Sequence, residues 1–268
     1  MIRKVLIAIF VISLAVLFAG NVESAKKKKS FDDLCLDILE TIQSFYPVRS
    51  TEMGIHAYDH RLADYSSSSV KKMTKKLKSH EKQLYRYKSA KLSDHQRINY
   101  QLVKSNVDIA LLDLEGIKWH KRSPQLYVDE AINGIYFLML SKHAPLPEKV
   151  VPLISRMRAV PALLATARKN IKEPPRVYIE AALESLASGM QFYREVAAQL
   201  INELPDREDE ILEASTKARE AMNDFLTYLS ELPAGPETGF AIGKDNFDYK
   251  LSNEYFLTFD ADSLLQIG

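Results

Sequence analysis

The sequence has 268 residues, of which 46% are hydrophobic and 26% are charged, an ordinary mixture for a globular protein. This composition excludes a disordered tail and a disulfide-stapled mini-protein, and 9 glycines are too few for the hairpins of a large β-sandwich or barrel. With 36 basic and 35 acidic side chains, the chain also lacks the positive excess of a nucleic-acid-binding protein.

The first 24 residues have the order of a secretory signal peptide. Arg3 and Lys4 form a positive start, residues 5–20 are almost uniformly apolar, and Val22 and Ser24 are small residues suited to a cleavage site. The alternative is an uncleaved anchor helix, although a membrane span needs about 20 apolar residues. We therefore expect an exported protein, periplasmic or extracellular, that contacts the membrane only if this segment is retained.

The segment after the cleavage site is basic, whereas the rest of the chain is mildly acidic. Residues 25–30 read as a linker because Lys26 to Lys29 are consecutive lysines. Without residues 1–24 the chain has 34 basic and 34 acidic side chains, and the part after Lys29 has 30 and 34. Residues 31–268 are therefore expected to form the folded body.

The body reads as one helix after another. Residues 31–46 repeat apolar side chains at helical spacing, and Cys35, the sole cysteine, lies on that apolar face as an expected inert thiol. Ser66 to Ser69 offer N-cap hydroxyls, and Ser93 with Gln96 forms a capping-box pattern. The further helices are expected at 69–87, 93 to about 119, 124–140, 148–160, 161–170, 175–205 and 206–232. The last of these carries one apolar stripe, formed by Ile211, Ala214, Ala218, Ala221, Phe225 and Leu229. The prediction is an all-α array of seven to eight helices.

The last part of the chain, residues 238–268, has a different pattern. It carries many large apolar side chains, among them Phe247, Tyr255 and Leu265, and no later sequence to cover them. We expect an irregular apolar segment that was cut off from a longer chain, since a domain edge usually ends in polar, dispensable residues. Its expected partners are the missing C-terminal half or a second copy of the chain.

Several motifs, in order, resemble the N-terminal half of the bacterial domain-of-unknown-function 885 family. They are Phe45-Tyr46-Pro47, Thr51-x-x-Gly54, Tyr58-Asp59-x-Arg61, Trp119 with Ser123-Pro124 and Tyr127, Ala144-Pro145-Leu146, Arg156-x-x-x-x-Pro161, Pro174-Pro175-Arg176-Val177-x-x-Glu180 and Gly239-Phe240-x-x-Gly243. Together they cover residues 31–268. The resemblance implies a helical, zinc metallopeptidase-like protein about twice this length.

The same resemblance places the zinc site in the C-terminal half, at a His-Glu pair followed by a further histidine. The His-Glu pair in this sequence is His80-Glu81, and no histidine follows it at the required spacing. We therefore expect no catalytic residue, no metal ligand and no cofactor in this chain, with zinc confined to full-length relatives. Whether the chain is an enzyme stays open.

One histidine pair provides a weaker alternative. His56 and His60 lie four apart with Asp59 between them, a spacing that could hold a metal on a helix. Gly54 and the turn-like sequence that follows argue against a helix there. The structural interpretation gives Gly54 a helix-ending role and pairs Asp59 with Arg61. The other histidines, including His120 and His143, are expected at the surface or in caps.

Four residues are candidates for a substrate channel. Arg176 and Glu180 lie four apart on one helix face, and in the family resemblance this helix lines the channel. The competing interpretation is a surface ion pair of a few tenths of a kcal/mol. Tyr58 and Trp119 are candidate cleft aromatics, with core packing as the default for such residues.

The sequence is consistent with two alternative functions. The first is an exported helical fragment of a metallopeptidase-like protein that shapes a peptide-binding channel, lacks the zinc site and is inactive alone. The second is a complete exported, non-enzymatic helical binding module whose tail folds back or dimerises.

Overall fold

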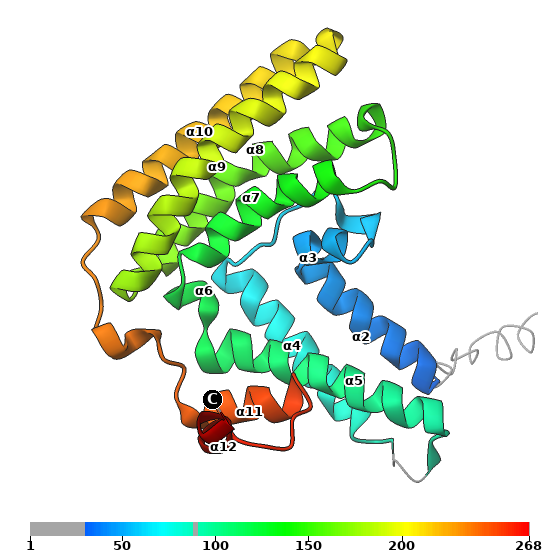
Figure 1. Cartoon of the computed structure of the whole chain (residues 1–268). Coiled ribbons are helices and arrows are strands. Elements are labelled where there is room, and N and C mark those ends of the chain that lie inside the picture. The colour runs from blue at the N-terminus through cyan, green and yellow to red at the C-terminus, as the bar shows by residue number, and fades with distance from the viewer. Residues whose placement is uncertain (1–29, 88–90, 268) are drawn as a thin grey trace, which may run out of the picture.

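The computed structural model describes residues 30–87 and 91–267, and this part is helical throughout (Figure 1). Nine α-helices have at least seven residues, and no strand forms in the described part. The elements are α2 (Phe31–Phe45), α3 (Pro47–Glu52), η1 (His56–Tyr58), α4 (Ser67–Leu84), α5 (Asp94–Leu111), η3 (Leu112–Ile117), α6 (Trp119–Arg122), α7 (Gln125–Leu140), α8 (Leu146–Asn170), α9 (Arg176–Glu203), η4 (Pro205–Arg207), α10 (Glu208–Glu231), η5 (Glu237–Phe240), α11 (Lys244–Asn253) and α12 (Ala261–Ile267). The predicted all-α class is confirmed, with more helices than the seven to eight expected.

The helices form two groups that are joined by short elements. In the first group α7, α8, α10 and α9 pack in a closed ring, each against the next. In the second group α2, α4 and α5 pack against one another, and α3 connects the groups by contacting both α2 and α7. Figure 1 shows the first group at the upper left and the second below it. The signal peptide predicted at residues 1–24 and lysines 26–29 lie outside the described residues.

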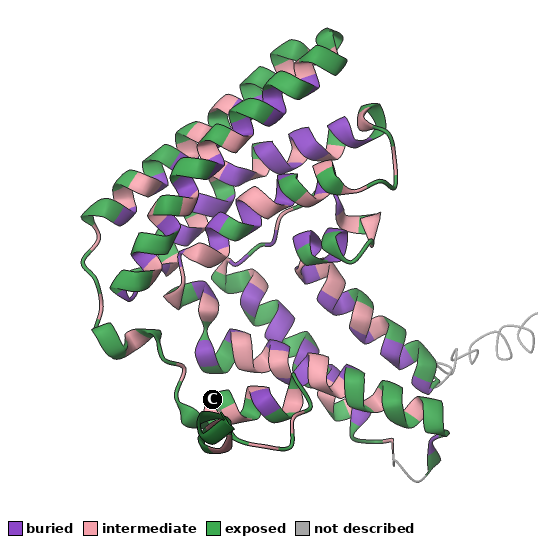
Figure 2. Ribbon diagram, viewed as in Figure 1, coloured by how far each residue is buried: buried purple, intermediate pink, exposed green. Residues whose placement is uncertain are grey.

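Side chains at helical spacing form one continuous core (Figure 2). On α10 the predicted apolar stripe is buried, and Ala214, Ala218 and Phe225 are each 0% exposed. Cys35 is also buried, and burial raises the pKa of its thiol to about 11, as expected of an inert cysteine. The core residues come from both groups of helices.

Local capping patterns correctly located two helix starts. Ser93 accepts a hydrogen bond from the backbone N–H of Gln96, whose side chain in turn accepts one from the backbone of Ser93. Ser66 accepts a hydrogen bond from the backbone of Ser69 at the start of α4. These bonds satisfy donors that have no partner inside the helix, so the sequence alone identifies them.

Helix α8 is continuous, whereas the sequence pattern predicted two helices that meet at Pro161. Pro152 and Pro161 both lie inside it. Proline removes one hydrogen bond and crowds the preceding turn, but packing along the rest of a long helix can offset that cost. The packing here is extensive, since α8 contacts both α7 and α10. Among the described helices, α8 alone has the length and hydropathy of a membrane span, and half of its apolar window is buried inside the protein.

The end of α5 also differs from the prediction of one helix reaching Trp119. Residues Leu112–Ile117 form a π-helical segment, and Lys118 then adopts a left-handed backbone with φ 60°. Trp119 begins the separate short helix α6. A π-helical turn is uncommon and often occurs at functional sites. This break turns the side chains of Asp113 and Trp119 toward each other, as described below.

The C-terminal segment is more regular than the predicted irregular tail, because it contains α11 and α12. Helix α11 packs on α5 and η3, where Leu251 is buried. Most other large apolar side chains of the segment stay exposed, including Phe256 at 50%, Leu265 at 82% and Ile267 at 72%. The expectation of an apolar surface on this segment is therefore met in the described residues.

Candidate functional site

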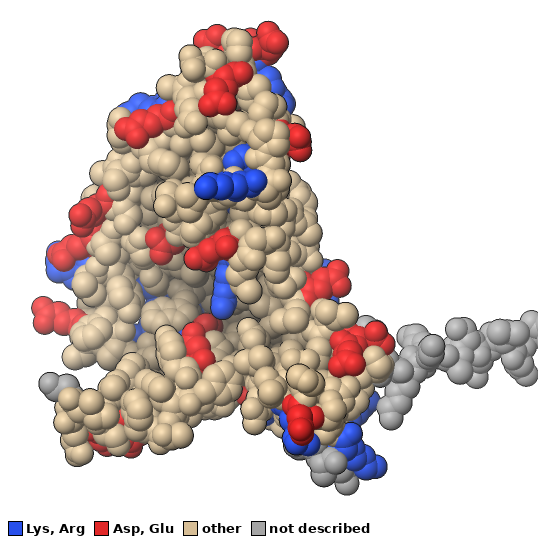
Figure 3. Space-filling view, turned by 45° about the vertical axis from the view of Figure 1, so that its right-hand side comes forward, with Lys and Arg blue, Asp and Glu red and all other residues tan. Residues whose placement is uncertain are grey.

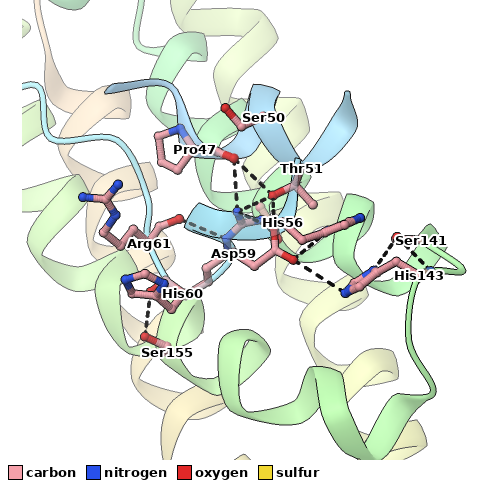
Figure 4. Close-up of polar contacts among 12 residues, drawn as sticks. Pro47, Ser50, Thr51, His56, Asp59, His60, Arg61, Ser141, His143 and Ser155 are labelled. Carbon is pink, nitrogen blue, oxygen red and sulfur yellow. Dashed lines mark hydrogen bonds and ion pairs between the residues drawn. The ribbon is translucent and has the colours of Figure 1, made fainter. Parts of the chain in front are cut away.

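The motif residues Thr51, Asp59 and Arg156 converge on one buried polar cluster, of which Figure 4 labels Thr51 and Asp59. Arg156 is 0% exposed and donates hydrogen bonds to the Oγ1 atom of Thr51 at 2.6 Å and to the backbone oxygens of Arg61 at 3.0 Å and Gly134 at 2.6 Å. The Thr51 hydroxyl donates to the Oδ1 atom of Asp59 at 2.6 Å. We call this set the Arg156 cluster. Burial lowers the pKa of Arg156 to about 10, so the guanidinium stays charged at neutral pH.

Gly54 ends α3, as the sequence suggested. Its φ is 80°, and its N–H donates to the backbone oxygen of Thr51 while Ile55 donates to Ser50. This pair of bonds is the Schellman arrangement, for which glycine is preferred. The predicted pairing of Asp59 with Arg61 is wrong in the described structure, because the Asp59 carboxylate lies beside Arg156, 3.8 Å away, and His56, 2.8 Å away.

Two histidines approach the open side of the Asp59 carboxylate. The Nδ1 atom of His56 lies 2.8 Å from Oδ2 of Asp59, and the Nε2 atom of His143 lies 3.8 Å from the same oxygen. The two imidazole rings are stacked, with centroids 3.4 Å apart. His60 is exposed and is not a member of this group. The partner of His56 is therefore a distant histidine on the α7–α8 connection rather than its neighbour in sequence.

A pocket of about 310 Å³ lies between α2, α5, η3 and α6. Its aromatic lining is Tyr46, Tyr65, Trp119 and Phe256, and its charged lining includes Asp113 and Arg49. We call it the aromatic pocket. Burial raises the pKa of the Tyr46 and Tyr65 phenols above their ordinary range, so both hydroxyls stay protonated at neutral pH.

Asp113 is the carboxylate of this pocket. Its Oδ1 atom accepts a hydrogen bond from Nε1 of Trp119 at 3.1 Å and one from Nζ of Lys250 at 3.2 Å. Burial raises the pKa of Asp113, while the Lys250 ammonium opposes that shift. Among the described residues both hydrogen bonds fall on Oδ1, so Oδ2 keeps its lone pairs for a further donor.

A second, larger pocket of about 710 Å³ lies between α4 and the η3–α6 segment. Its lining contains six lysines, which are Lys71, Lys75, Lys78, Lys82, Lys118 and Lys121. The acidic residue among the lining side chains is Glu115, whose Oε2 atom lies 2.7 Å from Nζ of Lys78. We call this the lysine groove. Its charge excess suits anionic groups such as carboxylates.

His120 borders both pockets, and so does Leu114. The His120 side chain is buried, and its Nδ1 atom has no hydrogen-bond partner in the described structure. Burial, together with the positive charges of Lys121 and Lys118, lowers the pKa of His120 to about 4. The imidazole is therefore neutral at pH 7. Its buried position differs from the position at the surface or in a cap that the sequence suggested. Figure 3 shows a hollow on one face of the molecule with basic and acidic side chains around it.

The four predicted channel residues do not gather in one place. Arg176 and Glu180 are highly exposed on α9, with charged atoms 3.9 Å apart, and border a shallow depression beside Phe240. Tyr58 lies in η1 with the Arg61 guanidinium 5.0 Å from its ring centre. Trp119 alone of the four lines the aromatic pocket.

Sequence reasoning missed the residues that complete the pocket. Tyr65 is brought to Trp119 only by packing of separate elements, and Asp113 reaches Trp119 through the π-helical turn, which the apolar pattern of the sequence did not predict. Tyr46 belongs to the Phe45-Tyr46-Pro47 motif, so the family resemblance could have identified it as a candidate pocket residue. His143 was dismissed as isolated, and only the tertiary contact with His56 reveals its role.

A model of the family described as "Bacterial protein of unknown function (DUF885)" matches residues 47–268. Among solved structures, the chain is similar to one from Shewanella oneidensis described as a "putative lipoprotein of unknown function", with a TM-score of 0.77 and 20% identity. The match covers 89% of this chain and 44% of that chain, so this chain spans less than half of that protein's length. At this identity the likeness shows a shared fold. No curated protein matches the chain.

Proposed function

The chain belongs to the DUF885 family of bacterial proteins of unknown function, and from that premise we propose that its described part is the peptide-binding wall of an exported protein. The observation that carries the proposal is the aromatic pocket, where Asp113 lies beside the ring of Trp119. A pocket of about 310 Å³ is of the size that holds a small ligand or a side chain. The signal-peptide pattern of residues 1–24 supports export.

The chemistry of the pocket suits a peptide ammonium group. Aromatic faces attract cations, and a carboxylate adds a charged acceptor. Lys250 already places a primary ammonium 3.2 Å from Oδ1 of Asp113, which shows the type of group that this carboxylate accepts. The ligand ammonium would bind Oδ2. The adjoining lysine groove would take the carboxylates of the same peptide or of its acidic side chains.

The family resemblance adds a proposal about the reaction. The wall would hold peptides for zinc-dependent hydrolysis at a His-Glu pair with a further histidine, a combination that these 268 residues do not contain at the required spacing. The alternative is a binding module that releases its ligand unchanged. Incubation of the purified chain with peptide and zinc, followed by mass spectrometry, tests both cases together, because cleavage by this chain alone would contradict both.

Binding itself is testable because Trp119 is the sole tryptophan of the chain. Titration with the tetrapeptide Lys-Ala-Ala-Glu should change its fluorescence in a saturable manner. The same peptide with both amino groups acetylated should bind at least about tenfold more weakly, since it loses a charge-assisted hydrogen bond.

The variant Asp113→Asn should lose at least about tenfold in affinity for Lys-Ala-Ala-Glu by calorimetry, because the amide cannot pair with the ammonium. Asp224→Asn, an exposed residue on α10, is the matched control and should bind like the wild type. Equal affinities of the Asp113→Asn and wild-type proteins would refute the assignment of Asp113. Absence of saturable binding would refute the proposed function.

A further inference from the structure

We propose that His56, Asp59 and His143 bind a divalent cation of the zinc class. One atom of each side chain can serve as a ligand, and these atoms all lie within 4.8 Å of one another. Tetrahedral zinc with ligands at about 2.1 Å separates neighbouring ligand atoms by about 3.4 Å. The separations of 2.8 Å and 3.8 Å from Oδ2 of Asp59 lie on either side of this value. Small side-chain movements would therefore suffice.

The donor set also suits such a cation. Imidazole nitrogen and carboxylate oxygen are common zinc ligands, and two histidines with one carboxylate leave a coordination position for water. In Figure 4 both imidazoles extend toward the same carboxylate from different elements, His56 from η1 and His143 from the α7–α8 connection. A bound ion would thus cross-link two segments that are far apart in sequence.

The side chains behind the ligands are arranged as supports for a metal site. The Nδ1 atom of His143 lies 2.7 Å from Oγ of Ser141, a contact that leaves Nε2 facing Asp59. The Oδ1 atom of Asp59 is held by the Thr51 hydroxyl at 2.6 Å, which leaves Oδ2 facing the histidines. Such outer hydrogen bonds orient metal-binding histidines and carboxylates in known sites.

The position of the cluster allows a cation to enter. The side chains of His56 and His143 are 25% and 29% exposed, whereas that of Asp59 is 8% exposed. The Arg156 guanidinium, 3.8 Å from Oδ1 of Asp59, places one positive charge behind the site. This charge would weaken binding of a second cation, so we expect moderate rather than very tight affinity.

The test is equilibrium dialysis of the full chain against Zn²⁺, together with the visible absorption of added Co²⁺. We expect one equivalent of zinc and the spectrum of a low-coordinate cobalt site. His143→Ala should weaken zinc binding at least about tenfold, and so should His56→Ala. His143 lies on a connection between helices, and an unchanged circular dichroism spectrum will show that its variant is folded.

His60→Ala is the matched control, because His60 lies four residues from His56 but outside the cluster. It should leave zinc affinity unchanged. The proposal is overturned if the wild-type chain binds no stoichiometric zinc, or if His60→Ala loses as much affinity as His143→Ala. Neither result bears on peptide binding at the aromatic pocket, so the two proposals fail separately.

Discussion

The side chain of Arg156 joins segments that are distant in sequence. Its guanidinium donates to the Thr51 hydroxyl and to the backbone oxygens of Pro47, Arg61 and Gly134. A buried charge is stable only when it is paired and hydrogen-bonded, and this one is surrounded by acceptors. Arg156 of the Arg156-x-x-x-x-Pro161 motif therefore has a structural role in the fold. Through the Thr51 hydroxyl it also holds the Asp59 carboxylate in place beside His56.

Glu130 provides a residue-scale prediction about pH. Burial raises its pKa from 4.5 to about 7, although the backbone N–H of Ala63 and the charge of Arg156 oppose the shift. Between these two pH values the folded state binds more protons than the unfolded state, so stability falls as pH rises. The loss is complete above pH 7 and amounts to about 3 kcal/mol, at about 1.4 kcal/mol per pKa unit.

Glu130→Gln keeps an oxygen acceptor for Ala63 and has no charge to bury. Urea unfolding at a series of pH values should show the variant gaining stability relative to the wild type as pH rises from 4.5 to 7. The gain should then level off. A stability difference that is independent of pH would show that Glu130 does not titrate in this range.

At the scale of one element, the π-helical segment η3 positions two side chains of the aromatic pocket. A regular helix continuing from α5 would have carried the side chains of Asp113 and Trp119 to different faces, since residues six apart do not align at 3.6 residues per turn. The wider turn and the left-handed Lys118 let Nε1 of Trp119 reach Asp113 at 3.1 Å. The aromatic pocket depends on this contact.

The connection between α10 and η5 gives an element-scale prediction. Gly235 donates a backbone hydrogen bond to Pro174 at 2.9 Å, and an added Cβ would lie 2.4 Å from the backbone oxygen of Glu173. Gly235→Ala should therefore destabilise the protein by about 1–3 kcal/mol, the usual cost of overpacking, measured by urea unfolding. Gly239→Ala is the control, because its Cβ would meet only Cγ of Pro175 at 3.4 Å. Equal stability losses would argue against the tight contact.

At the scale of the whole molecule, the C-terminal segment exposes several large apolar side chains in the described part of the chain. Phe256, Leu265 and Ile267 are each at least half exposed, and Figure 2 shows this segment largely in the exposed colour. Large apolar side chains that are exposed to water in this way favour association. We therefore expect the purified chain to self-associate as its concentration rises, as seen by analytical ultracentrifugation.

Leu265→Lys should shift that association to higher concentration, because a charged side chain opposes burial of the segment. Val151→Lys replaces an exposed apolar side chain, 58% accessible, on α8 and should leave association unchanged. A wild-type chain that stays monomeric at all concentrations would contradict this expectation.

At the scale of the whole chain, local signals located the helices well. Apolar periodicity, capping serines and prolines act within a few residues, so the starts of α4 and α5 and the buried stripe of α10 were predictable. The two prolines of α8 misled that reasoning, because packing against α7 and α10 outweighs their local cost. The resemblance to the DUF885 family was likewise confirmed over residues 47–268.

Local sequence signals could not locate the aromatic pocket or the cluster of His56, Asp59 and His143. Asp113, Tyr65 and Trp119 come from different elements, and His143 on the α7–α8 connection meets His56 on η1. By itself the sequence determined the helical class, most helix boundaries and the family, since these follow from short-range backbone geometry and motif order. Tertiary structure alone decided which polar side chains meet. Such contacts depend on the packing of the long helices against one another, and they produce no periodic pattern in the sequence.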